Sequence, residues 1–297
     1  MVRISLVVPL FSDSRRYIDR LPLQRKQWIS LKNQTDSDFE LVLADNASHD
    51  DVVGLAREYF PDAISIRHEV PKNTTGARLA GVRKASCPHV VTLDSDCIVW
   101  PRFIERWKLF AAYCPREVGV GGFYWYNGIV VSGPEWIVGE KGSERIDYAG
   151  LEAFTRGHLP GARAGYPMPV SITDEDRSDP WSEPFQWGGG FFYSNACFPK
   201  EVYLKIGTPD ADLTGYGHDD SLFGMTLKKF GPPVRYVCGI PVLHQCHRNL
   251  KMGDASHVED CITQVENLKA VDRRRKLLGG CGSIEELQRK LDEAGKP

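Results

Sequence analysis

The sequence predicts an α/β fold in which a mostly parallel sheet is flanked by helices. Over the first hundred residues, short apolar segments rich in Val, Ile and Leu alternate with segments of helical length. Strands that are separated by helices pair in parallel and bury both faces of the sheet under those helices. One apolar segment ends abruptly in two acids, Asp94 and Asp96. Ligands of parallel sheets lie beyond the carboxyl ends of the strands, so these acids favour a binding site at that edge.

The expected elements follow in order along the chain. The strands of the first part are 4–9, 39–44, 63–68 and 89–93, and the helices between them are 15–31, 50–59 and 76–85. From about residue 121 the pattern changes, with a strand at 123–126, helices at 199–206 and 221–230, a strand at 234–242 and a loop at 243–247. The tail is expected to be helical to residue 278, to break at Gly279 and Gly280, and to resume after Ser283, where Ser283-Ile284-Glu285-Glu286 fits a capping box.

The composition is that of an ordinary globular protein. Of the 297 residues, 42% are hydrophobic and 26% are charged, and the formal net charge of −2 argues against a broad nucleic-acid-binding surface. No apolar run approaches the roughly 20 residues that span a bilayer, and the N-terminus is too strand-like for a signal peptide. The eight cysteines form no C-x-x-C pair, which favours a reduced, cytoplasmic protein without zinc. The helical tail would allow peripheral attachment to a membrane.

The segment 91–96 is the most informative part of the chain. Two carboxylates separated by one residue follow an apolar strand, and an unpaired buried charge is costly. Hard oxygen donors suit Mn²⁺ or Mg²⁺, held jointly with the phosphates of a substrate. Two interpretations stay open: a metal site, or acids that face water or cap the next helix. The polar pair Asp45 and Asn46 ends an earlier strand and is expected at the same edge, which favours the metal site.

Five ordered blocks of residues 5–247 resemble the family-2 glycosyltransferases with the GT-A fold. The blocks are Val7-Val8-Pro9-Leu10, residues 43–50, residues 73–96, residues 187–201 and residues 206–220, closed by His244-Gln245-Cys246-His247. The resemblance implies an inverting, metal-dependent transfer of a sugar from a nucleoside-diphosphate sugar to an acceptor hydroxyl. It also implies one GT-A domain, with a nucleotide-binding half at 1–100, an acceptor-binding half at 101–250 and a C-terminal helical extension at 251–297.

The family pattern implies roles for residues of the donor site. Asp45 would read the nucleotide base, because a carboxylate accepts from a ring N–H of uracil or guanine; a helix N-cap is the alternative. Arg78 would lie near the ribose or pyrophosphate, where a guanidinium suits anionic oxygens. Asp94 resembles the acid that contacts ribose or sugar, and Asp96 resembles the acid that binds Mn²⁺ or Mg²⁺. The other donor-site residues that the resemblance implies are Pro9, Asn46, Ser95, Gly189 and Gly190. Asn46 departs from the pattern, which often has an acid there.

The second half of the chain would supply a metal-binding histidine and the catalytic acids. His244 and His247 both resemble the late histidine that completes the metal site, and a loop histidine bonded to backbone is the alternative for each. Asp220 would be the base that takes the proton of the acceptor hydroxyl. Both Asp219 and Asp220 also suit a helix N-terminus. The residues expected against the acceptor are Trp187, Tyr216 and Asp219. Core packing is the alternative for the tryptophan.

Other functions stay open at the level of sequence. A retaining GT-A transferase shares the D-x-D pattern and the late histidine, and a non-catalytic sugar-nucleotide-binding module shares the fold. A nucleotidyltransferase would have a glycine-rich phosphate loop after the first strand, which residues 11–16 lack. Family frequency favours a UDP-sugar over a GDP-sugar, and the acceptor could be a saccharide, a lipid, a protein or a small molecule. Residues 139–183, rich in Gly, Pro and charge, are expected to form an acceptor loop or lid.

Overall fold

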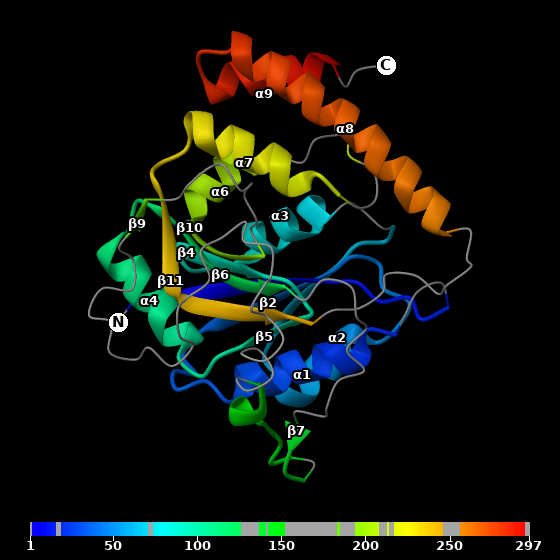
Figure 1. Ribbon diagram of the computed structural model, residues 1–297, viewed down its shortest axis with the longest axis vertical. Coiled ribbons are helices and arrows are strands. Elements are labelled where there is room, and N and C mark those ends of the chain that lie inside the picture. The colour runs from blue at the N-terminus through cyan, green and yellow to red at the C-terminus, as the bar shows by residue number, and fades with distance from the viewer. Residues whose placement is uncertain are drawn as a thin grey trace.

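The computed structural model of the chain describes residues 2–15, 19–70, 74–125, 137–140, 142–151, 183–184, 194–207, 213, 217–245 and 256–294. These residues are built around one large sheet with helices on both faces (Figure 1). The sheet has the order β3-β2-β1-β4-β10-β6-β11-β5, and β9 pairs with β11 off this path. The predicted α/β class with a mostly parallel central sheet is confirmed.

The first half of the sheet is parallel throughout. β2 (Glu40–Asp45) and β4 (His89–Leu93) flank β1 (Ile4–Leu10), and β3 (Ile64–Arg67) lies outside β2. The helices α1 (Leu21–Lys32), α2 (Val52–Tyr59) and α3 (Thr74–Lys84) follow β1, β2 and β3 in turn. Every residue of β1 is buried, as expected for a central strand that is covered on both faces. The carboxyl ends of these parallel strands therefore share one edge.

The second half of the sheet is mixed. β10 (Asn195–Pro199) runs antiparallel to both β4 and β6 (Val118–Trp125). β11 (Val234–His244) is parallel to β6 and antiparallel to β5 (Cys97–Val99) and to β9 (Glu183–Pro184). The short strands β7 (Ile137–Val138) and β8 (Arg145–Ile146) form a separate hairpin. Because His244 stands opposite Cys97, the end of β11 reaches the turn that follows β4.

Two apolar cores fill the two faces of the sheet. One face is covered by α1, α2 and α4 (Phe103–Tyr113), which contribute Trp28, Val52 and Trp107 to the core. The other face is covered by α3, α6 (Lys200–Ile206) and α7 (Asp219–Phe230), which contribute Leu79, Tyr203 and other apolar side chains. Figure 1 shows this three-layer arrangement, with α1 and α2 on one side of the strands and α3, α6 and α7 on the other.

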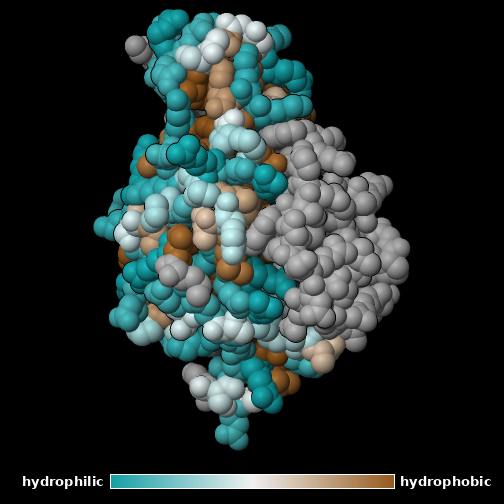
Figure 2. Space-filling view, turned by 90° about the vertical axis from the view of Figure 1, so that its left-hand side faces the viewer, coloured by the Kyte–Doolittle hydropathy of each residue, from teal (hydrophilic) through white to brown (hydrophobic). Residues whose placement is uncertain are grey.

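The last two helices, α8 (Ser256–Gly280) and α9 (Ile284–Ala294), pack on α7 outside the three layers (Figure 1). Their apolar seam contains Leu278, Ile284 and Leu287 and reaches Phe230 at the end of α7. On the face drawn in Figure 2, the coloured residues are mostly hydrophilic, and a strip of hydrophobic residues lies in the upper part of the molecule, where these helices lie. Among the described residues, none of the helices combines the length and the hydropathy that a bilayer crossing requires.

Some element boundaries differ from those predicted. α1 begins at Leu21 and not at residue 15. The hydroxyls of Ser12 and Ser14 donate to Asp50 and fix residues 12–14 in the loop that follows β1. β11 continues to His244, so the loop predicted at 243 and 244 is wrong; backbone pairing with β5 and β6 carries the strand two residues further.

The C-terminal helices also differ in detail. α8 continues through Gly279 and ends at Gly280, so the break falls later than predicted. Ser283 caps α9 as predicted, since its Oγ accepts from the Glu286 amide at 3.1 Å. The reciprocal bond of a capping box is displaced by one residue, because Glu286 Oε2 accepts from the Gly282 amide at 2.8 Å.

Three buried elements of the fold, α4, β5 and β10, are absent from the sequence prediction. α4 carries its apolar residues at helical spacing, with Phe103, Trp107 and Phe110 buried on one face, so the signal was present. β10 is a five-residue strand that ends in Pro199, and all of it is buried. A short apolar run of this kind does not distinguish a strand from the start of the following helix.

Candidate functional site

The turn after β4 carries Asp94 and Asp96 at the predicted edge. Three hydrogen bonds to the backbone of this turn hold it there. The carbonyl oxygen of Asp94 accepts from Gln27 Nε2 of α1 at 2.5 Å. The Asp94 amide donates to the carbonyl of Ser194 at 3.2 Å, and the Gln245 amide donates to the carbonyl of Asp96 at 2.9 Å. Residues from three distant parts of the chain therefore position this turn before any ligand binds.

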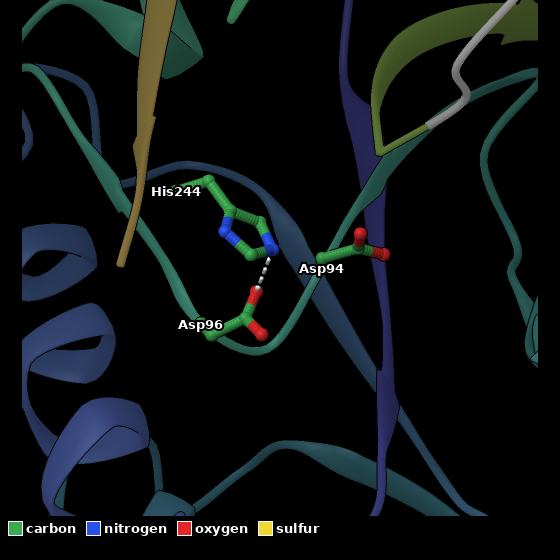
Figure 3. A group of neighbouring side chains, drawn as sticks. All are labelled: Asp94, Asp96 and His244. Carbon is green, nitrogen blue, oxygen red and sulfur yellow. Dashed lines mark ion pairs between the residues drawn. The ribbon is translucent and has the colours of Figure 1, made fainter. Parts of the chain in front are cut away.

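His244 meets this turn from the end of β11. Its Nε2 lies 3.3 Å from Asp96 Oδ1, and one candidate ligand atom each from Asp94, Asp96 and His244 lie within 4.8 Å of one another. Figure 3 shows His244 and Asp96 facing each other, with Asp94 two residues before Asp96 on the same turn. The Asp96 side chain is only 7% exposed. The expected meeting of Asp96 with a late histidine is observed for His244.

The donor set fits a divalent cation. Two carboxylates crowded into a largely buried turn repel each other unless a positive charge lies between or beside them. Burial, followed by the negative charges of Asp96 and Asp94, raises the pKa of the adjacent Cys97 thiol well above its ordinary value. Two carboxylate oxygens and one imidazole nitrogen are ligands that Mn²⁺ accepts, and the oxygens alone suit Mg²⁺.

Arg78 of α3 connects this turn to the second pair of acids. Its side chain is only 4% exposed and forms ion pairs with Asp94 Oδ1 and, at 3.3 Å, with Asp219 Oδ2. Thr75 Oγ1, one turn earlier on α3, lies 3.4 Å from the same Asp219 oxygen. A buried guanidinium with two carboxylates is a site of concentrated charge. The predicted convergence of acids from separate chain regions is therefore observed for Asp94, Asp96 and Asp219.

Asp219 and Asp220 occupy the first turn of α7. The residue before them, His218, is the N-cap and has a φ of 66°, and Gly217 has a φ of 103°. Negative charges in a first helical turn are stabilised by the helix dipole, so the N-terminal role considered for these acids holds alongside any catalytic one. Tyr203 of α6 is fully buried nearby, and its burial raises the pKa of its hydroxyl.

Asp45 lies at the end of β2, where it is almost fully buried. Its Oδ1 accepts from the Ser48 amide at 2.9 Å, and its Oδ2 forms an ion pair with Arg67, the residue opposite it on β3. Arg67 Nη2 also donates to the Ser48 carbonyl at 2.7 Å. The N-cap of α2 is Asp51, which accepts from the Gly54 amide. The alternative of an Asp45 N-cap is therefore wrong.

The other donor-site residues that the structure describes lie along the same edge. Pro9 stands opposite Ala44 in the last part of β1, and the amide of Asn46 donates to the carbonyl of Leu10 at 2.8 Å. Ser95 is buried inside the turn between the two acids. The predicted residues that lie outside the described part of the chain are Trp187, Gly189, Gly190, Tyr216 and His247.

The predicted lid begins in a segment that is docked on the sheet. Glu144 forms an ion pair with Arg25 of α1, and Tyr148 donates to the carbonyl of Val99 at 3.1 Å. The amide of Ile146 donates to Asn33 Oδ1 at 3.2 Å. Residues 142–151 are therefore an anchor and not a free lid, while residues 152–182 of the predicted lid lie outside the described residues.

Sequence reasoning missed several residues that build the site. Gln27 sits inside a segment that was predicted as an ordinary helix. Thr75 lies just before the helix predicted at 76–85, inside the block 73–96, and no role was predicted for it. Arg67 ends a strand and becomes visible only once β2 and β3 are placed in register, with Asp45 opposite Arg67. Tyr203 has the sequence spacing of a core aromatic residue, and it does belong to the core, so its pattern does not distinguish it from other core residues.

Known proteins that resemble this chain are named as a glucosyltransferase and as a synthase. Validoxylamine A glucosyltransferase of Streptomyces hygroscopicus subsp. jinggangensis (strain 5008) is 27% identical over 251 residues, which cover 80% of this chain and 56% of that protein. Chondroitin synthase of Escherichia coli is 20% identical over 260 residues, which cover 82% of this chain and 34% of that protein. The chain thus spans about half of the first relative and about a third of the second.

Solved structures share the fold at low sequence identity. The crystal structure of GalNAc-T7 with UDP, GalNAc and Mn²⁺ gives a TM-score of 0.54 at 14% identity, covering 84% of this chain and 45% of that one. The crystal structure of S. aureus TarS 1–349 in complex with UDP-GlcNAc gives a TM-score of 0.52 at 13% identity, covering 86% of this chain and 62% of that one.

The family model for glycosyl transferase family 2 matches residues 25–198, which is more than half of the chain. The matched span runs from α1 to β10 and includes the turn with Asp94 and Asp96. This chain belongs to glycosyltransferase family 2 and has the GT-A fold of its structural neighbours.

Proposed function

We propose that this chain transfers a sugar from a nucleoside-diphosphate sugar to an acceptor hydroxyl, with inversion at the anomeric carbon and with the help of a divalent cation. The observation that carries the proposal is the single rim on which Asp96 and His244 meet while Arg78 joins Asp94 to Asp219. A cation site beside a buried arginine is what a diphosphate leaving group needs. Family membership supports the reaction class.

The donor would be held by residues of the parallel half. Asp96 and His244 would hold the cation, and Asp94 would contact it or the ribose. Bound there, the cation would supply Lewis-acid stabilisation of the diphosphate as negative charge develops on it. Arg78 would turn one of its N–H groups to the same phosphate oxygens or to the ribose. Asp45 and its partner Arg67 would face the base together, one accepting from a ring N–H and one donating to a ring carbonyl.

The acceptor would be activated by Asp220. In this step Asp220 takes the proton of the acceptor hydroxyl as the oxygen attacks the anomeric carbon. The bond from that carbon to the diphosphate oxygen breaks, and the nucleoside diphosphate leaves with the bonding electrons. A single displacement inverts the anomeric configuration, whereas a retaining enzyme would return the starting configuration. The configuration of the product, read by proton NMR, decides between these two mechanisms.

UDP-glucose is the first donor to test. The relative from Streptomyces is named a glucosyltransferase, and the solved structures of similar fold contain UDP or UDP-GlcNAc. The test incubates the full chain with UDP-glucose and Mn²⁺ and measures the release of UDP. Screening GDP-glucose and other UDP-sugars in parallel would identify a different donor.

Replacing the proposed base gives the decisive variant. Asp220→Asn should lower turnover on the order of 100-fold or more, because the amide cannot take the proton, and should leave the affinity for UDP with Mn²⁺ within about twofold by calorimetry. Glu201→Gln is the matched control, since Glu201 is an exposed acid in the first turn of the neighbouring helix α6. Unchanged turnover in Asp220→Asn would remove Asp220 from the proposal.

A further inference from the structure

The turn that precedes α7 has an unusual backbone conformation. Gly217 and His218 both have positive φ values, 103° and 66°, and α7 begins directly after them with Asp219 and Asp220. A non-glycine residue in the left-handed region costs on the order of 1 kcal/mol, and His218 offers no side-chain cap to the helix. Such a turn keeps one conformation only when its surroundings hold it.

A residue from the C-terminal extension provides that hold. Asn267 of α8 is 1% exposed, and its Nδ2 donates to the carbonyl of Gly217 at 3.0 Å. The bond joins two residues that are 50 positions apart in the chain. A buried side-chain amide that donates to a backbone carbonyl fixes the orientation of the peptide that carries it. The direction in which the acids enter α7 is therefore tied to the position of α8.

The rest of α8 strengthens this tie. Arg274, seven residues after Asn267 and so on the same face of the helix, is 3% exposed and donates from Nη1 to Thr226 Oγ1 at 2.9 Å. Between them, Ala270 and Val271 pack against Leu222 of α7. Figure 1 shows α8 lying along α7.

Arg274 also lines a small cavity together with Asp219. The cavity has a volume of about 10 Å³, room for about one water molecule, and it is lined by Asp219, Thr75 and Arg274 together with apolar side chains of α6 and α7. α8 thus places a buried cation on the same cavity as Asp219. The helix contributes both an amide that donates to the turn and a buried arginine that lines the cavity of Asp219.

We propose that Asn267 is a positioning residue of the active site: it fixes the Gly217–His218 turn so that Asp219 and Asp220 point at the acceptor, and the C-terminal extension is thereby part of the catalytic unit. This proposal rests on the proposed function of Asp220. The proposal assigns to α8 a role in turnover. It predicts that removing the Asn267 amide lowers turnover without weakening donor binding.

The experiment compares three full-length variants with the wild type. Asn267→Ala removes the amide, Asn267→Asp keeps its size but offers no N–H at neutral pH, and Asn267→Gln keeps an amide on a longer side chain. Leu268→Ala is the matched control, because Leu268 is the next residue and is exposed. The readouts are kcat and KM for UDP release from UDP-glucose with Mn²⁺, the dissociation constant of UDP with Mn²⁺, and hydrogen exchange of the amides at residues 217–222.

The expected result is a split between turnover and binding. Asn267→Ala and Asn267→Asp should lower kcat on the order of 10- to 100-fold, since a small misplacement of a catalytic group has effects of that size. UDP binding should stay within about twofold, exchange at 217–222 should rise, and Asn267→Gln should recover part of the lost kcat. Leu268→Ala should match the wild type in every readout.

Two results would overturn the proposal. One is wild-type kcat together with wild-type exchange at 217–222 in Asn267→Ala and Asn267→Asp. The other is a parallel fall of kcat and UDP binding in proportion to the unfolded fraction, which would make Asn267 a stability residue only. If the wild type releases no UDP from any donor, the proposed function fails, and the exchange readout still decides whether Asn267 holds the turn.

Discussion

At the scale of single residues, Arg78 is the group on which the charge balance of the site depends. Its guanidinium is buried between the carboxylates of Asp94 and Asp219. A variant without this guanidinium would leave both carboxylates without their arginine partner. Removing one partner of a buried ion pair costs about 3 kcal/mol or more. We therefore expect Arg78→Met to lower the melting temperature by roughly 5 to 10 °C and to weaken UDP binding on the order of tenfold or more.

The same helix offers a matched control for this prediction. Arg83 is exposed near the end of α3, so Arg83→Met removes an equal charge and should leave both readouts close to the wild type. Arg78→Lys should restore the charge but not the fork that reaches two carboxylates, and should recover only part of the stability. Equal melting temperatures for Arg78→Met and Arg83→Met would contradict the central role of Arg78.

The residues of the site differ in how far sequence alone could identify them. Asp94 and Asp96 were predictable because two acids that end an apolar strand have few other uses in a buried sheet. Arg67 was not, because its pairing with Asp45 depends on the register between β2 and β3, which local patterns do not encode. Gln27 and Asn267 act through hydrogen bonds to backbone far away in the chain, and no spacing in the sequence predicts such a bond.

At the scale of elements, the loop between β1 and α1 is held in place by Asp50, which lies in the connection between β2 and α2. Burial alone would raise the pKa of the Asp50 carboxyl, but hydrogen bonds from Ser12 and Ser14 outweigh it and lower the pKa to about 2. The folded-state pKa is thus below the ordinary value of 3.8. The stabilisation is fully present above pH 4 and is lost as the pH falls toward 2. It amounts to about 2 kcal/mol.

Asp50→Asn should therefore lose about 2 kcal/mol of unfolding free energy at pH 7, and its difference from the wild type should shrink as the pH falls from 4 to 2. Urea unfolding at a series of pH values measures this. Asp51→Asn is the control, because asparagine caps the start of α2 about as well as aspartate does. A constant difference between Asp50→Asn and wild type across this range would show that the carboxylate charge is not the cause.

The element boundaries that the sequence did not predict are also set by contacts between residues far apart in the chain. The helix predicted from residue 15 begins at Leu21, and the bonds of Ser12 and Ser14 to Asp50 fix the residues just before residue 15 outside α1. His244 looked like a loop residue and is the last residue of β11, because β5 and β6 pair with it from both sides. Local patterns identified most of the helices and the parallel strands of the first half, while long-range pairing set where they end.

At the scale of the whole molecule, the candidate cation site joins the two halves of the sheet. The parallel half supplies Asp94 and Asp96 on the turn after β4, and the mixed half supplies His244 at the end of β11. A ligand that binds both halves stabilises the folded state by an amount that grows with its concentration relative to its dissociation constant. We expect UDP and Mn²⁺ together, each at about 100 times its dissociation constant, to raise the melting temperature by roughly 5 °C or more.

The pattern of this shift separates a cation site from simple nucleotide binding. UDP with Mn²⁺ should give a larger shift than the sum of UDP alone and Mn²⁺ alone, because each ligand completes the site of the other. Asp96→Asn should abolish this excess shift while keeping the shift from UDP alone. Asp62→Asn changes an exposed carboxylate between α2 and β3 and should keep the full excess shift. Additive shifts in the wild type would mean that the cation and the diphosphate do not meet, and the rim formed by Asp94, Asp96 and His244 would then have another purpose.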